Sequence, residues 1–86
     1  MNVRVVLSGR NYQMADRLPQ QLTLPDGATV DEALRALAGM LPNGQHLPES
    51  CLVAVSGVHL GTVSRHQPRA LKEDDELLLI APVAGG

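Results

Sequence analysis

The C-terminus holds the residues whose possible chemistry is easiest to interpret. The last five are rigid or small: Pro82, Val83, Ala84, Gly85 and Gly86. Glycine lacks a Cβ atom, so the backbone of another protein can approach it closely. Proline has a fixed φ, which stiffens the root of the segment. Fully extended, residues 82–86 reach roughly 16–18 Å. We therefore expect a flexible tail, residues 82–86, that can carry the Gly86 carboxylate into a narrow channel of another protein.

Two terminal glycines alone are weak support for such a tail. With glycine at about 7% of average usage, two end a chain by accident in roughly 0.5% of cases. Small flexible residues are also common at termini. The interpretation therefore depends on the elements that hold the tail.

The other reactive side chains suggest no catalytic or metal site. Cys51 is the single cysteine; it adjoins an apolar strand, and buried cysteine commonly acts as a small hydrophobic residue. His46, His59 and His66 lack metal-ligand spacing, and no cysteine pair supports them. No catalytic triad or phosphate-binding glycine loop is visible. We expect no metal and no bound cofactor.

Composition narrows the class of partner. The 86 residues carry seven Lys and Arg against nine Asp and Glu, for a formal net charge of −2, with one aromatic residue. The chain has no basic stripe, which argues against a nucleic-acid partner. No apolar run approaches the roughly 20 residues that cross a bilayer, and the N-terminus lacks a signal region. We expect a cytoplasmic protein with no membrane partner.

Hydrophobic patterns predict five strands, at residues 3–8, 20–24, 51–56, 59–63 and 77–80. The first two are close enough in sequence to form an antiparallel hairpin. Residues 52–55 show no polar alternation, so we expect both of their faces to be covered. The last strand is apolar throughout, which favours a central position in the sheet.

One helix is predicted over residues 30–40. Thr29 and Glu32 fit a capping box. An apolar stripe follows at helical spacing, formed by Val30, Leu34, Leu37 and Leu41. If the last strand lies parallel to the first, the chain is an α+β, ubiquitin-like β-grasp: a mixed sheet of about five strands with one main helix on one face. The domain would span residues 1–81 and the tail residues 82–86.

Several segments resemble the small sulfur-carrier family that includes the molybdopterin-synthase small subunit and the thiamine-pathway sulfur carrier. They are the opening strand over 3–7, the helix entry over 24–30, the strand over 53–55, the run over 71–77 and the tail. The Pro-Val-Ala-Gly-Gly ending and the chain length favour the molybdopterin branch. The family usually has glycine where Asp74 stands, but aspartate tolerates a left-handed backbone better than most residues.

The resemblance implies a carrier or co-substrate, the small subunit of a molybdopterin synthase complex in the favoured branch, and not an enzyme. A ubiquitin-activating-type adenylyltransferase would adenylate the Gly86 carboxylate, using its own ATP and Mg²⁺. A persulfide from a sulfurtransferase would then leave a Gly86 thiocarboxylate. The sulfur would pass to the large subunit of molybdopterin synthase, or to another sulfur-accepting enzyme.

The resemblance also implies a partner surface on the exposed sheet face around the root of the tail, near Ser8, His59 and Ile80. Arg4, Val6 and Leu78 could share it, depending on strand order. Only Ile80 of the first three is apolar. Either the partner differs from the family's usual one, or the alignment slips by one residue in the short fourth strand. The acidic run over 73–76 could steer a partner, although a solvated turn is the simpler interpretation.

Three functions remain open from the sequence. The first is a sulfur carrier for molybdopterin, with thiamine or another thiocarboxylate pathway as the alternative. The second is a β-grasp interaction module with no chemistry at its tail. The third is conjugation of the tail to protein lysines. The sequence identifies neither the activating enzyme nor the sulfur acceptor, and it leaves the oligomeric state open.

Overall fold

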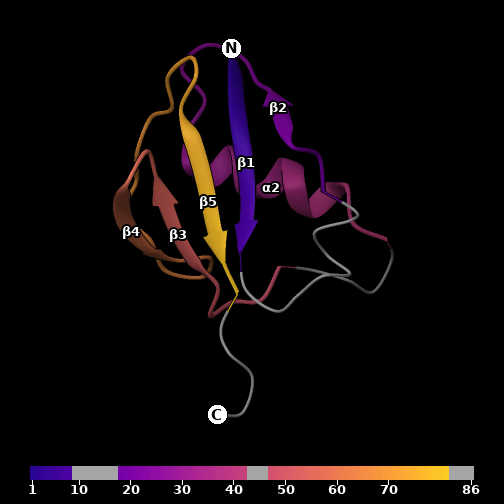
Figure 1. The fold of residues 1–86 in the computed structure, drawn as a ribbon, viewed down its shortest axis with the longest axis vertical. Helices are drawn as coiled ribbons and strands as arrows, with labels where there is room; N and C mark the ends of the chain where they lie inside the picture. Colours follow the sequence, from indigo (N-terminus) through magenta and orange to yellow (C-terminus); the bar gives the residue numbers. More distant parts are fainter. Residues whose placement is uncertain (9–17, 43–46, 82–86) are drawn as a thin grey trace.

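The computed structural model describes residues 1–8, 18–42 and 47–81. With the labels of Figure 1, the elements are β1 (Asn2–Ser8), β2 (Gln21–Thr23), α2 (Val30–Gly39), β3 (Leu52–Val55), β4 (Val58–Thr62) and β5 (Glu76–Ile80). All six elements predicted from the sequence are present, and their ends differ from the predictions by at most one residue. Figure 1 shows a single sheet with α2 across its back.

The strand order is β2-β1-β5-β3-β4, which makes β5 the central strand as predicted. The β1 and β5 strands run parallel, with Arg4 opposite Glu76 and Ser8 opposite Ile80. The other neighbouring pairs are antiparallel. A mixed five-stranded sheet with one helix on one face is the β-grasp fold, so the predicted fold class is confirmed.

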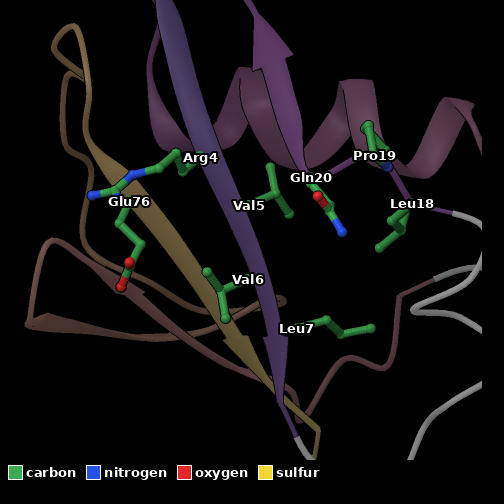
Figure 2. A pocket seen from close by; sticks show the side chains of 8 residues that line it. All are labelled: Arg4, Val5, Val6, Leu7, Leu18, Pro19, Gln20 and Glu76. Carbon is green, nitrogen blue, oxygen red and sulfur yellow. The ribbon is translucent and has the colours of Figure 1, made fainter.

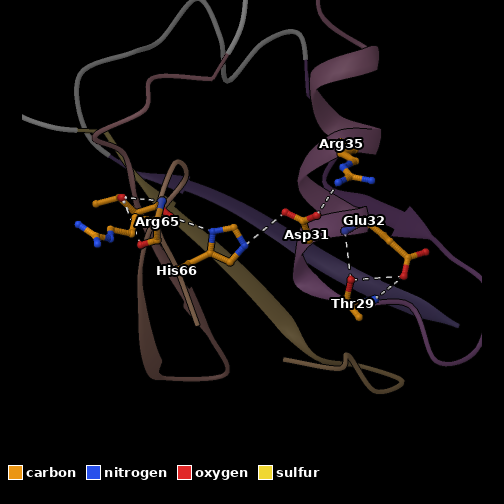
Figure 3. A network of polar contacts seen from close by, with 7 residues as sticks. Thr29, Asp31, Glu32, Arg35, Arg65 and His66 are labelled. Carbon is orange, nitrogen blue, oxygen red and sulfur yellow. Dashed lines mark hydrogen bonds and ion pairs between the residues drawn. The ribbon is translucent and has the colours of Figure 1, made fainter. Parts of the chain in front are cut away.

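The capping box fixes the start of α2. The Glu32 amide donates to Thr29 Oγ1, and the Thr29 amide donates to Glu32 Oε1, each at 3.3 Å. Figure 3 shows this reciprocal pair beside the ion pair between Arg35 and Asp31, at 3.0 Å. These bonds satisfy amides that the first helical turn leaves without partners. The apolar stripe of the helix can then face the sheet.

The core lies between α2 and one face of the sheet. Its largest fully buried side chains come from the helix, three strands and the segment before β3: Val3, Val30, Leu37, Cys51, Val53, Val55, Leu77 and Leu79. Cys51 is 1% exposed, and burial raises the pKa of its thiol. The thiol therefore stays protonated and packs as a core side chain, as the sequence predicted.

The second face of the sheet has no covering layer among the described residues, and here one prediction is wrong. Leu52 was expected to be covered on the basis of its apolar strand, but it is 42% exposed. Ala54 lies on the same face and is 2% exposed, because its small side chain sits in register between those of Leu78 and His59. An unbroken apolar strand therefore indicates a central position here, but not burial on both faces.

Two tight turns at one end of the sheet bring the backbone into the left-handed region. Ser56 has φ +47° and Gly57 φ +88°, as a two-residue hairpin of the twisted type requires. Asp74 has φ +67°, and its amide donates to the Asn2 carbonyl at 2.8 Å. The turn therefore keeps its left-handed residue with aspartate in place of the glycine that is usual in the carrier family that the sequence resembles.

Asp75 joins these turns to the start of β5. It is 9% exposed, accepts from Ser56 Oγ at 2.8 Å, and accepts from the Lys72 amide at 2.8 Å. Burial acts to raise the pKa of Asp75, but those two hydrogen bonds and the charges of Arg69 and Lys72 outweigh it, and the pKa is lowered. Asp75 is therefore a structural anchor and not part of a solvated acidic face.

Replacing this carboxylate should weaken the fold in a pH-dependent way. We expect Asp75→Asn to lower the free energy of unfolding at pH 7 by about 2 kcal/mol, because hydrogen bonds to an ionised group are lost. Since the pKa of Asp75 is lowered in the folded state, the ionised carboxylate stabilises the fold at pH values above the ordinary pKa of aspartate. That contribution disappears as the pH falls through the lowered pKa, below about pH 4.

Urea unfolding at pH 7 and pH 3 measures the loss of unfolding free energy in Asp75→Asn and its dependence on pH. Asp74→Asn is the matched control: its carboxylate is exposed, asparagine also tolerates the left-handed region, and a change below about 0.5 kcal/mol is expected. Equal losses for the two variants at pH 7 would contradict the anchor role of Asp75.

Candidate functional site

The chain leaves the described fold from the end of the central strand. The Ala81 amide donates to the Ser8 carbonyl at 2.9 Å, and Ala81 is 7% exposed. This bond extends the β1–β5 ladder by one residue beyond Ile80. The predicted tail, Pro82 to Gly86, lies outside the described residues. What the structure establishes is that its point of attachment is the well-packed centre of the sheet.

Two rows of side chains in register cross the open sheet face. The row nearer the chain exit runs from Ser8 through Ile80 and Leu52 to Thr62, and the next runs from Val6 through Leu78 and Ala54 to His59. Residues paired in register point to the same face of a sheet. The four larger apolar side chains of the two rows, which we call the apolar strip, are Val6, Leu52, Leu78 and Ile80.

The three residues predicted for the partner surface all lie on this face. Ser8 and Ile80 are direct neighbours across β1 and β5, whereas His59 is one row farther from the exit, beside Ala54. Val6 is 39% exposed and Leu52 is 42% exposed. The apolar strip is therefore accessible, with the polar residues Ser8, Thr62 and His59 at the ends of the rows. The face around the exit is therefore more apolar than the three predicted residues suggested.

Leu52 was not predicted as part of this surface. Residues 52–55 are all apolar, so no alternation in the sequence distinguishes the open face from the covered one. The fourth strand also carries an irregularity: the register shifts between Val53, opposite Gly61, and Ala54, opposite His59. This shift falls in the strand where we considered a one-residue slip of the alignment.

Every residue of the two rows lies in the part of the chain that matches a family model. Residues 5–86 match the family model described as the ThiS family. The chain belongs to the ThiS family. Members of this family are sulfur carriers rather than enzymes, and they work with adenylyltransferases and with sulfur-accepting enzymes. No curated protein and no solved structure gave a match.

A hollow of about 410 Å³ lies beside β1 in this ThiS-family chain, next to the residues that lead into β2. Val5, Leu7 and Leu18 supply part of its apolar lining, and Arg4 and Glu76 are its charged residues. Figure 2 shows Val6 and Leu7 leaving β1 in opposite directions, so Val6 belongs to the open face and Leu7 to the other. Among the described residues, its lining contains no serine, cysteine or histidine.

A polar cluster of the ThiS-family chain lies beside α2. His66 Nδ1 is 3.0 Å from the Thr62 carbonyl, and because a carbonyl only accepts, Nδ1 carries a proton. Its Nε2 is 3.7 Å from Asp31 Oδ1. Figure 3 shows the Arg65 side chain turned away from this pair. The cluster connects the segment after β4 to the first turn of α2, on the helix side of the sheet.

Neither a metal site nor a membrane span is found in the described part of the chain. Within residues 1–8, 18–42 and 47–81, no three His, Cys, Asp or Glu side chains are grouped so that they could hold an ion. No helix in these ranges is long and apolar enough to cross a bilayer. The features that remain as a functional site are the exit of β5 and the apolar strip next to it.

Proposed function

We propose that this chain carries sulfur as a thiocarboxylate on Gly86 and delivers it to a pterin precursor in molybdopterin biosynthesis. The observation that carries the proposal is the family match, which extends through Gly85-Gly86 to the end of the chain. The fold supports it, because the residue before the tail is anchored at the centre of the sheet. The setting that fits the ATP-dependent partner is the cytoplasm.

The chemistry requires little from the carrier beyond a carboxylate that can be reached. A carboxylate oxygen of Gly86 attacks the α-phosphate of ATP in the activating enzyme, and pyrophosphate leaves. A persulfide of a sulfurtransferase then attacks the acyl carbon and displaces AMP. A second thiol cleaves the resulting acyl disulfide, which leaves the thiocarboxylate on the carrier and a disulfide on the donor. ATP and Mg²⁺ belong to the activating enzyme.

The apolar strip is the surface that we assign to partner docking. Adjacent strands lie about 4.8 Å apart, so the strip extends about 10 Å from β1 to β3. It adjoins the exit of the tail, since Ile80 is the last residue of β5. A partner that covers the strip therefore holds the root of the tail as well. Ser8 and His59 would border the contact and Ile80 would lie within it.

Transfer from a thiocarboxylated carrier separates the candidate pathways. The carrier is to be mixed in turn with a molybdopterin-synthase large subunit and its pterin precursor, and with a thiazole-forming enzyme and its substrates. We expect sulfur to appear in the pterin, because the tail and the length resemble that branch. Transfer in the thiazole reaction alone would assign the chain to the thiamine pathway. Failure in both would point to another acceptor.

A further inference from the structure

The chain is poor in groups that an activated carboxyl could acylate. Of its seven basic residues six are arginine, and Lys72 is the single lysine. The guanidinium of arginine stays protonated and is a poor nucleophile, whereas the amine of lysine can attack an acyl group. The other amine is that of Met1, which donates to the Leu24 carbonyl at 2.7 Å and lies 3.6 Å from Asp26 Oδ1.

Lys72 is held so that its side chain remains available. Its amide donates to Asp75 Oδ2 at 2.8 Å, and its carbonyl accepts from the Asp75 amide at 3.1 Å. The residue is exposed, and within the described part of the chain its ammonium makes no ion pair shorter than 4.0 Å. Two neighbouring carboxylates are engaged elsewhere, Asp75 with Ser56 and Glu73 with the Asn2 amide.

The fold also favours the tail of a second copy as the one that reaches Lys72. Lys72 precedes β5 and the tail follows it, so the five residues of β5 separate them by about 17 Å. Figure 1 shows the two ends of β5 at opposite ends of the sheet. Residues 82–86 span at most about 18 Å. A tail could reach the lysine of its own chain only by extending almost fully back along the whole sheet, whereas the tail of a second copy approaches from solvent without that restriction.

We propose that Lys72 is the acceptor through which two copies of this chain become joined when Gly86 is activated and no sulfur donor is present. The Lys72 amine attacks the acyl carbon of the Gly86 adenylate of another copy. An amide bond forms, the bond from the acyl carbon to the phosphate oxygen breaks, AMP leaves, and the amine releases a proton to solvent. The proposal rests on the proposed activation of Gly86, and it adds an activity and its site.

Two sources of activated Gly86 test the proposal. In one, the chain is incubated with its activating enzyme, ATP and Mg²⁺ without sulfur donor, and pyrophosphate release is followed. In the other, the chain is prepared with a Gly86 α-thioester, which needs no enzyme. We expect a denaturant-resistant dimer with the mass of two chains less the leaving group, its branch mapped to Lys72. Lys72→Arg, which keeps the charge, should abolish the dimer.

Each alternative product overturns the inference. A cyclised monomer would show that the tail reaches its own lysine, and a dimer in Lys72→Arg would place the acceptor elsewhere, the Met1 amine included. Pyrophosphate release without a dimer would refute the inference and leave the proposed function intact. Absence of pyrophosphate would count against the proposed function, while the thioester experiment would still decide between the products.

Discussion

Deletion of Gly86 is expected to abolish adenylation of the chain while leaving its melting temperature unchanged. The deletion moves the terminal carboxylate back by one residue, about 3.5 Å. Misplacement of a reacting group by about 1 Å can reduce a rate roughly 100-fold. We therefore expect kcat/KM of the activating enzyme for the shortened chain to fall by at least about 10³-fold, measured by ATP–pyrophosphate exchange.

The fold should tolerate this deletion because its last described hydrogen bond is that of Ala81 to Ser8. Gly86→Ala is the matched control: it adds a methyl group but keeps the carboxylate in place, so we expect a smaller loss than for the deletion. Full exchange activity with Gly86 deleted would remove the central role of the terminus. The chain would then be better explained as a β-grasp interaction module with no chemistry at its tail.

Leu52→Glu should raise the KM of the activating enzyme for the chain by about 10–100-fold. Apolar side chains near the centre of an interface commonly contribute 2 kcal/mol or more to binding, and a carboxylate there would be desolvated without a partner. Leu52 is 42% exposed, so the substitution acts on the open face and the fold should remain intact. Steady-state kinetics measure the KM, and circular dichroism checks that the variant is folded.

Val58→Glu provides the matched control for this variant. Val58 is 47% exposed and belongs to β4, but it pairs with Val55 beside the turn at the other end of the strands. Val58→Glu therefore adds the same charge at a similarly exposed position outside the apolar strip. The KM of the activating enzyme for this variant should change by less than about two-fold. If both substitutions raise KM equally, the strip is not the docking surface.

Local patterns in the sequence were sufficient to predict the main elements. The capping box at Thr29 and Glu32 begins α2 because its donors and acceptors are three residues apart. The left-handed backbone at Asp74 could be predicted for the same reason, since turn conformation depends on the local sequence. The unbroken apolar run of β5 indicated a central strand, and its parallel pairing with β1 followed from the β-grasp order.

The sequence could not reveal contacts between distant segments. The hydrogen bond from Ser56 to Asp75 joins residues 19 apart, so Asp75 could not be distinguished from its solvated neighbours. The close approach at Gly61, where a Cβ atom would lie 2.3 Å from the Arg65 carbonyl oxygen, also appears only in the folded chain. The exposure of Leu52 depends on which face α2 covers. All of these features arise from packing.

The most direct test of the central claim is the intact mass of the chain after incubation with the activating enzyme, ATP and a sulfur donor. A thiocarboxylate on Gly86 predicts a gain equal to the replacement of one oxygen by one sulfur, absent when Gly86 is deleted. An unchanged mass, with an activating enzyme that thiocarboxylates its own cognate carrier in the same assay, would contradict the assignment of this chain as the sulfur carrier of that enzyme. The same result with every plausible activating enzyme would contradict the account as a whole.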